Sequence, residues 1–552
     1  MKSLIVKIRK LKFNKNNFYV LIFYFIFVNL LYFSLYFTYF QQDEWYGFGQ
    51  AIVGLNNNFS NLFGVLGGYH FTPLSSLLYF IEYYIFGLNS AGFAFVSIQL
   101  HVVATFLVYI FSKSLLRNGK YALLASLIFS VANAPSQAVT WFAASSIEYA
   151  TIFALCSIIF WLKSFDGKNM KLMMFLSMIF LFLGLLFKED IITLFAVLPI
   201  LSIYKYGIKK QLKPFISLII LGVIYIIPRL VLQNSNASAI QIHTVQSFYN
   251  FLSVTILNAR VFITGLGFTI LSSSIIIVFL KTVVFGYLLS KLTGGFITIP
   301  DSVTEIFFTP LIAGILSILT VVIFTFLVWK NKKYITFKQE FLLLLTIPIS
   351  FFPYIFLGRD IILPESRYFY YPMIFVSIFL SLMVYFINNY FKGKKTKVFL
   401  SILLISFLFI NIHYDTKISN YIPLSNTRKK VINDLNAVVS NKESKVIYYI
   451  SGDPLPFQSG IGQMLVVLST QKNKNLNPFL ENYYLWNMGS QGYKEIKSLG
   501  IGYFYDYTEM KKTYLKYNLK PQNVIALKWD GVNSQMRNIT EQTRKLLISN
   551  EE

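Results

Sequence analysis

Long apolar runs recur between residues 18 and 413, and they constrain the fold more than any other feature of this 552-residue sequence. A helix needs about 20 mostly apolar residues to cross a bilayer, and most of these runs approach that length. Charged residues make up only 13% of the chain, whereas soluble globular proteins carry about 25%. The sequence therefore predicts an α-helical polytopic membrane protein and excludes a soluble enzyme, a disordered chain and a disulfide scaffold. The predicted spans are 18–40, 92–112, 121–134, 143–162, 171–187, 191–204, 214–232, 306–329, 341–357, 368–386 and 398–413.

Lys and Arg cluster between alternate runs, which is the pattern that orients membrane proteins with the positive side in the cytoplasm. About half of the 49 basic residues lie in the N-terminal tail and in these alternate connections. Consistency at both ends requires an even number of crossings, most simply two, within 251–290. We therefore expect about 13 transmembrane helices, with the helix count in 251–305 left open. The protein would be a multi-pass plasma-membrane protein with a cytoplasmic N-terminus.

The net charge of +25 arises from these membrane-flanking clusters, so we expect no nucleic-acid binding. After His413 the composition becomes more polar, and no run is long enough to span. Segments 446–450, 501–505 and 524–529 are rich in β-branched and aromatic residues and predict strands. Segments 431–439 and 539–548 have helical spacing. We therefore expect two domains, a transmembrane domain over 1–413 and a small extracytoplasmic α/β domain over 414–552.

Two adjacent carboxylates, Asp43 and Glu44, follow the first span directly. They could serve as a general base or as ligands of a divalent metal, or they could be a solvated acidic flank on the outer side. The segment 48–66 has the composition of a helix lying along the interface. His70 would share the same outer loop, either as part of a site or as a hydrogen-bonded structural residue.

Other ionisable residues stand close to predicted spans, where burial makes charge expensive and a functional role is the default hypothesis. For Lys188-Glu189-Asp190 the structural alternative is an internally satisfied polar turn. For the two outer arginines, the alternative to binding phosphate through a planar guanidinium is pairing with neighbouring acids. The candidates are Glu148, Lys188, Glu189, Arg359, Arg367 and Tyr368. No Walker loop, dinucleotide fingerprint, HExxH or Cys/His metal cluster occurs, so ATP-driven transport is disfavoured.

These motifs, taken together, resemble the GT-C superfamily of integral-membrane glycosyltransferases, which includes protein O-mannosyltransferases and aminoarabinose transferases. The resemblance covers roughly residues 1–415, and the C-terminal domain matches no family. It is carried by Asp43-Glu44, by His70-Phe71-Thr72-Pro73-Leu74 with Phe86-Gly87-Leu88-Asn89 and His101, by Phe187-Lys188-Glu189, and by Glu365-Ser366-Arg367-Tyr368-Phe369-Tyr370-Tyr371-Pro372.

The resemblance implies transfer of a sugar from a polyprenyl-phosphate donor in the membrane lipid to an acceptor glycan, lipid or protein at the extracytoplasmic face. Asp43, with Glu44, would be the base, with a divalent cation such as Mg or Mn as a further expectation. Lys188, Arg359 and Arg367 would hold the lipid phosphate, and His70 and Glu148 would line the cavity, with Glu189 and Tyr368 beside them. Sugar, acceptor and prenyl length stay open. The alternatives are a transporter or lipid-linked glycan flippase, and a membrane anchor for the outer domain.

Overall fold

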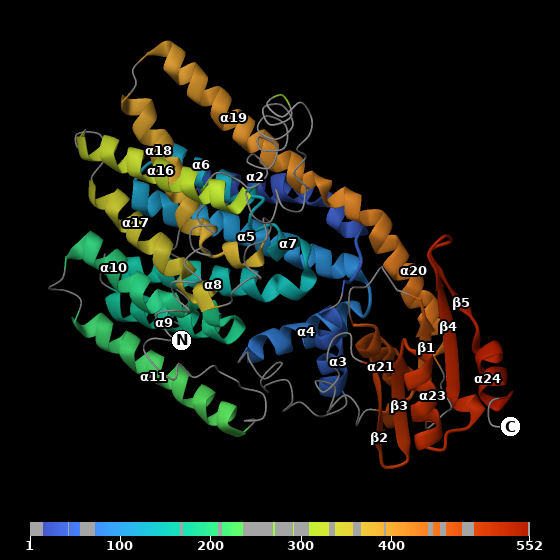
Figure 1. The fold of residues 1–552 in the computed structure, drawn as a ribbon. Coiled ribbons are helices and arrows are strands. Elements are labelled where there is room, and N and C mark those ends of the chain that lie inside the picture. Colours follow the sequence, from blue (N-terminus) through green and yellow to red (C-terminus); the bar gives the residue numbers. More distant parts are fainter. Residues whose placement is uncertain are drawn as a thin grey trace. The chain divides into compact units, whose positions relative to one another are not determined.

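The structure is a computed structural model, and it describes residues 15–41, 43–55, 72–165, 169–207, 212–235, 269–270, 291, 309–330, 337–356, 366–390, 393–439, 445–452, 460–476 and 491–549. The chain forms two compact units (Figure 1). The helical unit comprises Met1–Phe33, Phe95–Thr140 and Ala144–Ile418, and the α/β unit comprises Ser34–Ala94, Trp141–Ala143 and Ser419–Glu552. The α/β unit therefore contains residues 34–94 as well as the C-terminal residues.

Helices account for nearly all of the described part of the helical unit, and each predicted span contains one. Four helical stretches are long and apolar enough to cross a membrane, namely Ser90–Leu116, Phe142–Ser164, Met170–Phe187 and Met373–Tyr390. The predicted total of about 13 stays a prediction, because most of 251–305 lies outside the described residues. The α-helices are α2 (Lys15–Leu31), α5 (Ser90–Leu116), α6 (Gly119–Ser130), α7 (Gln137–Thr140), α8 (Ser145–Ser164), α9 (Met170–Phe187), α10 (Leu194–Tyr206), α11 (Leu212–Ser235), α16 (Thr309–Lys330), α17 (Phe337–Phe351), α18 (Met373–Tyr390) and α19 (Lys394–Thr416).

Small residues allow neighbouring helices of this unit to approach closely, as is common in membrane proteins. Helices α8 and α9 lie side by side (Figure 1), and the Ser177 hydroxyl donates to the Ser157 carbonyl oxygen at 2.9 Å. A Cβ atom added to Gly184 of α9 would lie 3.4 Å from the Ala150 carbonyl oxygen. An added Cβ would reach only ordinary van der Waals contact there, so the close approach of the two helices does not require glycine at this position.

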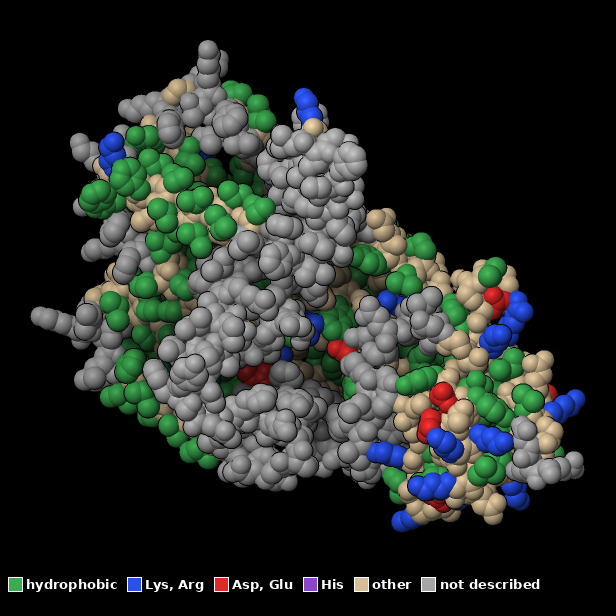
Figure 2. Space-filling view, viewed as in Figure 1, with side chains coloured by type: hydrophobic (Ala, Val, Ile, Leu, Met, Phe, Trp, Pro, Cys, Tyr) green, Lys and Arg blue, Asp and Glu red, His purple; other side chains and the backbone are tan. Residues whose placement is uncertain are grey.

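Apolar side chains cover the outer surface of the helical unit, where a lipid environment would meet them. Figure 2 shows hydrophobic side chains gathered over its helices. On α16, for example, Val322, Ile323 and Trp329 are each more than half exposed. A soluble protein rarely exposes apolar surface on this scale, so the structure agrees with a membrane location. Which side of the membrane each terminus occupies stays a prediction.

A five-stranded sheet forms the centre of the α/β unit, in the order β2-β3-β1-β4-β5. The three inner strands are parallel, and both edge strands pair antiparallel with their neighbours. Buried side chains from the sheet and its helices, including Ile447, Phe504, Met510 and Leu547, form one core. The strands are β1 (Lys445–Ser451), β2 (Gly492–Ile496), β3 (Leu499–Phe504), β4 (Val524–Asp530) and β5 (Gln535–Asn538), and the helices are α3 (Glu44–Leu55), α4 (Pro73–Phe86), α20 (Ile422–Val438), α21 (Ile461–Lys472), α23 (Tyr507–Lys516) and α24 (Thr540–Ser549).

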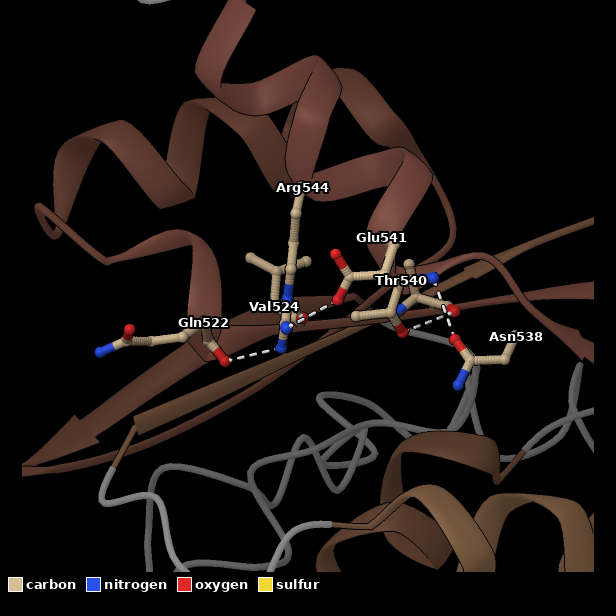
Figure 3. Close-up of polar contacts among 7 residues, drawn as sticks. Gln522, Val524, Asn538, Thr540, Glu541 and Arg544 are labelled. Atoms are coloured by element: carbon tan, nitrogen blue, oxygen red, sulfur yellow. Dashed lines mark hydrogen bonds and ion pairs between the residues drawn. The ribbon is translucent and has the colours of Figure 1, made fainter.

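Arg544 fastens the last helix, α24, to the sheet (Figure 3). Its Nε donates to the Val524 carbonyl oxygen at 3.0 Å, and its Nη2 donates to the Gln522 carbonyl oxygen at 2.9 Å. Thr540, at the start of α24, bonds to both backbone groups of Ala526 in β4. These contacts satisfy backbone groups at the edge of β4 and fix the C-terminal helix.

Helix α21 joins residues 34–94 to the C-terminal part of the α/β unit. Every residue from Ile461 to Thr470 is buried, including the polar Gln463. It packs against α3, and the Gln463 amide donates to the Tyr46 hydroxyl at 2.8 Å. The segment 48–66 was expected along the interface, but its described part, in α3, has its apolar face covered by protein.

Candidate functional site

Glu44 is the first residue of α3 and is fully buried. Its Oε2 accepts a hydrogen bond from the Gln41 backbone at 3.1 Å. Burial lowers the pKa of Arg428, on α20, and the negative charge of Glu44 opposes this change. Glu44 is therefore a buried acid whose charge acts on the partly buried Arg428 within the α/β unit.

Asp43 immediately precedes α3 and is half-buried. Its backbone carbonyl oxygen accepts from Tyr46 at 3.1 Å, which fixes the start of the helix. The side chains around it are rigid aromatics, because Phe40, Trp45 and Phe48 pack edge to face with centroids 4.8 to 6.2 Å apart. Of the two adjacent carboxylates, Asp43 belongs to the less buried residue.

A third acidic residue of the α/β unit, Glu82, was not among the candidates. It lies in α4, which is not among the apolar spanning helices, and it is 4% exposed. Burial raises its pKa to about 8, so it is mostly neutral at pH 7. Within the described residues Glu82 makes no hydrogen bond or ion pair. The sequence feature that could have identified Glu82 as a candidate is an acidic residue in an otherwise apolar helix.

In the helical unit, tyrosines connect the link after α9 to the turn before α18. The Tyr354 hydroxyl donates to Asp190 Oδ2 at 3.2 Å, and the Tyr354 ring lies 5.3 Å from the Tyr368 ring. Arg367 in turn lies over the Tyr368 ring at 4.7 Å, with its Nη2 donating to the Tyr368 hydroxyl at 3.0 Å. This chain of contacts brings the Lys188-Glu189-Asp190 link and the Arg367-Tyr368 turn to the same end of the unit.

Lys188 caps the C-terminal end of α9, with its backbone nitrogen bonded to the Gly184 carbonyl oxygen at 2.9 Å. Its ammonium group forms no hydrogen bond or ion pair with any other residue that the structure describes. Glu189 follows it at the start of a short 3-10 helix, Glu189–Thr193. The link therefore presents one available cation beside a structured turn.

Glu148 is fully buried in the first turn of α8. Ser97 of α5 lies 2.7 Å from its Oε2, and Tyr370, just before α18, is hydrogen-bonded to its carboxyl group. The Tyr370 hydroxyl also lies 2.8 Å from Nδ1 of His101. These contacts connect α5, α8 and the start of α18 through one buried polar network.

The structure thus brings several predicted site residues together at one end of the helical unit, namely Glu148, Lys188, Glu189, Arg367 and Tyr368. Sequence reasoning missed Ser97 and Tyr354, which connect them, because isolated Ser and Tyr residues carry no distinctive spacing. Asp43 and Glu44 belong to the α/β unit. His70 and Arg359 lie outside the described residues.

The described residues include no group of three or more His, Cys, Asp or Glu side chains able to hold a metal ion. One oxygen of Glu44, Oε2, accepts a hydrogen bond from the Gln41 backbone. The predicted Mg or Mn site at Asp43 and Glu44 stays a prediction.

No protein-family model and no curated protein matches the chain. Among solved structures, it is similar to the oligosaccharyltransferase of Archaeoglobus fulgidus in complex with Zn and sulfate, with 14% identity, a TM-score of 0.46 and coverage of 82% of this chain and 61% of that one. It is also similar to the same organism's AglB in complex with an inhibitory peptide and a dolichol-phosphate, with 12% identity, a TM-score of 0.42 and coverage of 85% and 68%.

A third similar structure is ArnT from Cupriavidus metallidurans bound to undecaprenyl phosphate, with 10% identity, a TM-score of 0.46 and coverage of 93% of both chains. The chain spans about three fifths of the length of the first oligosaccharyltransferase structure. The resemblance to the GT-C superfamily that the sequence motifs indicate stays a prediction.

Proposed function

We propose that the protein transfers a sugar from a polyprenyl-phosphate donor to an acceptor hydroxyl at the extracytoplasmic face of the membrane. The observation that supports this proposal is that the link containing Lys188 and the turn containing Arg367 lie at one end of the helical unit, where tyrosines connect them. Lys188 follows α9 and Arg367 precedes α18, and the proposal puts the phosphate of the membrane-embedded lipid beside these two cations. The acceptor would be a glycan, a lipid or a protein.

Cations at this position suit a phosphate leaving group. When the bond between the anomeric carbon and the phosphate oxygen breaks, negative charge grows on the phosphate, and preorganised cations stabilise the transition state. Arg367 is preorganised because its guanidinium is held on the Tyr368 ring and hydroxyl. Lys188 has no other anionic partner among the described residues, so it is available to the phosphate.

Asp43 is the base in this proposal. The acceptor oxygen forms a bond to the anomeric carbon, its proton passes to the Asp43 carboxylate, and the polyprenyl phosphate leaves. A carboxylate within hydrogen-bond reach of the hydroxyl typically contributes about 10²–10⁴-fold. A single displacement of this kind inverts the anomeric configuration. Glu44 supports the loop instead of reacting, because it is buried and paired.

Reconstituted protein in liposomes that contain polyprenyl-phosphate-linked sugar tests the base. Asp43→Asn should lower sugar transfer by about 10²–10⁴-fold while the thermal unfolding midpoint stays near that of the wild type. Full transfer by Asp43→Asn would remove the assigned base. Movement of the lipid-linked sugar across the bilayer without transfer would favour the flippase alternative.

Binding of polyprenyl phosphate alone tests the cation site. Arg367→Ala should weaken binding by about 10–100-fold, the value of a charged hydrogen bond of about 1.5–3 kcal/mol. Lys120→Ala is the matched control, since Lys120 is an exposed cation at the start of α6 and should bind the lipid like the wild type. Equal affinity of Arg367→Ala and Lys120→Ala would move the phosphate site elsewhere.

A further inference from the structure

A pocket of about 320 Å³, counting the space that is open to solvent, lies between the C-terminal ends of α5, α8 and α10. Its apolar part is formed by three buried leucines, one from each helix, namely Leu115, Leu162 and Leu201. Two cations, Arg117 and Lys205, also line it. No acidic side chain is among the described residues that line the pocket. The pocket therefore offers positive charge to an anion beside apolar side chains.

Arg117 has a backbone conformation that favours glycine. It follows the last residue of α5, its φ is 54°, and its backbone nitrogen donates to the Lys113 carbonyl oxygen at 3.1 Å. Glycine usually occupies this position at the end of a helix, because a Cβ atom is strained there. An outlier of this kind indicates that the side chain has a role. Arg117 is exposed, and its guanidinium forms no hydrogen bond or ion pair with any other residue that the structure describes.

Lys205 is the second cation of the pocket, and its position is fixed by the packing of α10 against α8. Its Nζ lies 5.0 Å from the centroid of the Tyr206 ring, which is a cation–π contact. The Tyr206 hydroxyl donates to the Leu162 carbonyl oxygen at 2.7 Å. The Lys205 ammonium group is therefore positioned by a ring that is itself anchored beside the pocket.

The pocket lies at the opposite end of the helical unit from the candidate site. Helix α8 has 20 residues and is about 30 Å long, close to the thickness of the hydrocarbon core of a bilayer. Glu148 is in its first turn, and Leu162 is near its last residue. A lipid bound here would therefore belong to the other leaflet from a donor held by Lys188 and Arg367. The basic clusters of the sequence predict that this end faces the cytoplasm.

The surroundings of the pocket favour a lipid over a small anion. Helices α5 and α8 are long and apolar enough to cross a membrane. Ile203 of α10, which precedes the pocket-lining Tyr204, exposes 40% of its surface. Acyl chains bury apolar surface by packing there, whereas a free phosphate ion has no apolar surface to bury. Cytoplasmic leaflets contain anionic lipids, and basic pockets between membrane helices bind their head groups.

We propose that this pocket binds the phosphate of an anionic phospholipid, whose acyl chains lie along the outer surface of α10. Arg117 and Lys205 bind the phosphate. The planar guanidinium of Arg117 can donate two parallel hydrogen bonds to phosphate oxygens, and the Lys205 ammonium group adds a second positive charge. This lipid site is independent of sugar transfer, because it lies in the other leaflet from the proposed donor site.

Native mass spectrometry of the full chain in a neutral detergent, titrated with phosphatidylglycerol, measures this binding. The wild type should bind phosphatidylglycerol more tightly than the zwitterionic phosphatidylcholine. Arg117→Gly should weaken phosphatidylglycerol binding by about 10–100-fold, the value of one charge-assisted hydrogen bond. Glycine suits the left-handed backbone at this position, so the variant keeps the fold. Lys205→Gln should also weaken binding.

Lys171→Gln is the matched control, because Lys171 is an exposed cation in the first turn of α9, at the same end of the unit. It is not among the described residues that line the pocket, so this variant should bind phosphatidylglycerol like the wild type. Equal losses for Arg117→Gly and Lys171→Gln would reveal a general surface-charge effect and overturn the site, as would unchanged binding by Arg117→Gly. Displacement of phosphatidylglycerol by an equal concentration of inorganic phosphate would overturn the assignment to a lipid.

Discussion

Glu82→Gln should remove a pH-dependent destabilisation of the α/β unit. Glu82 is 4% exposed, and burial raises its pKa from 4.5 to about 8. Because the folded state holds this proton more tightly than the unfolded chain, stability falls as pH rises from the unfolded pKa towards 8, and the loss then levels off. One pKa unit corresponds to about 1.4 kcal/mol. The wild type should therefore lose about 2–3 kcal/mol between pH 5 and pH 7 through this group alone.

Thermal unfolding in detergent at pH 5 and pH 7 measures this loss. A unit of roughly 200 residues shifts by about 2–4 °C for each kcal/mol, so Glu82→Gln should gain about 5–10 °C on the wild type at pH 7 and little at pH 5. Glu541→Gln is the control, because that side chain is 80% exposed and contributes under about 1 kcal/mol at either pH. A gain of Glu82→Gln that is equal at both pH values would refute the reasoning.

Three further perturbations follow from the contacts described above. Glu44→Gln should cost about 3 kcal/mol by leaving the half-buried Arg428 cation without its counter-charge. Addition of Arg428→Met should recover most of that loss in a double-mutant cycle by thermal unfolding, and strictly additive losses would contradict the pairing. Tyr354→Phe removes the hydrogen bond to Asp190 and should lower the unfolding free energy by about 1.5–3 kcal/mol, as measured by denaturant unfolding. An unchanged unfolding free energy would show that this hydrogen bond contributes nothing to stability. Arg544→Ala should speed hydrogen exchange in α24 by at least about tenfold while the membrane helices keep their protection, and uniform exchange throughout would argue against a local fastening role.

Local patterns in the sequence predicted much of this fold. Each long apolar run that the structure describes contains a helix, because crossing a bilayer demands length and apolarity that few other structures need. The predicted strands 446–450, 501–505 and 524–529 became β1, β3 and β4, and the helices 431–439 and 539–548 lie within or overlap α20 and α24. The edge strands β2 and β5 escaped prediction, since their polar residues, such as Lys494 and Arg537, do not alternate with apolar ones.

The parts that sequence reasoning missed depend on contacts between distant segments. Helix α21 is buried on all sides, so it lacks the one-sided apolar spacing that marks a surface helix. Glu44 and Asp43 are adjacent in the chain but have different surroundings, because the charge of Glu44 acts on Arg428 in the distant helix α20. Similarly, Ser97 and Glu148 form one network only because α5 and α8 are packed together.

The contact between Gln463 and Tyr46 joins residues 417 positions apart, and this separation has a consequence for biogenesis. Translation must proceed almost to the end of the chain before α21 exists to cover the aromatic face of α3. Until then the face of α3 that carries Tyr46 lacks its partner helix in a nascent protein whose first helices are already made, and exposed surfaces of this kind recruit chaperones and proteases. A ribosome that stalls before residue 461 should therefore release a fragment that is degraded quickly, however well its membrane helices have inserted.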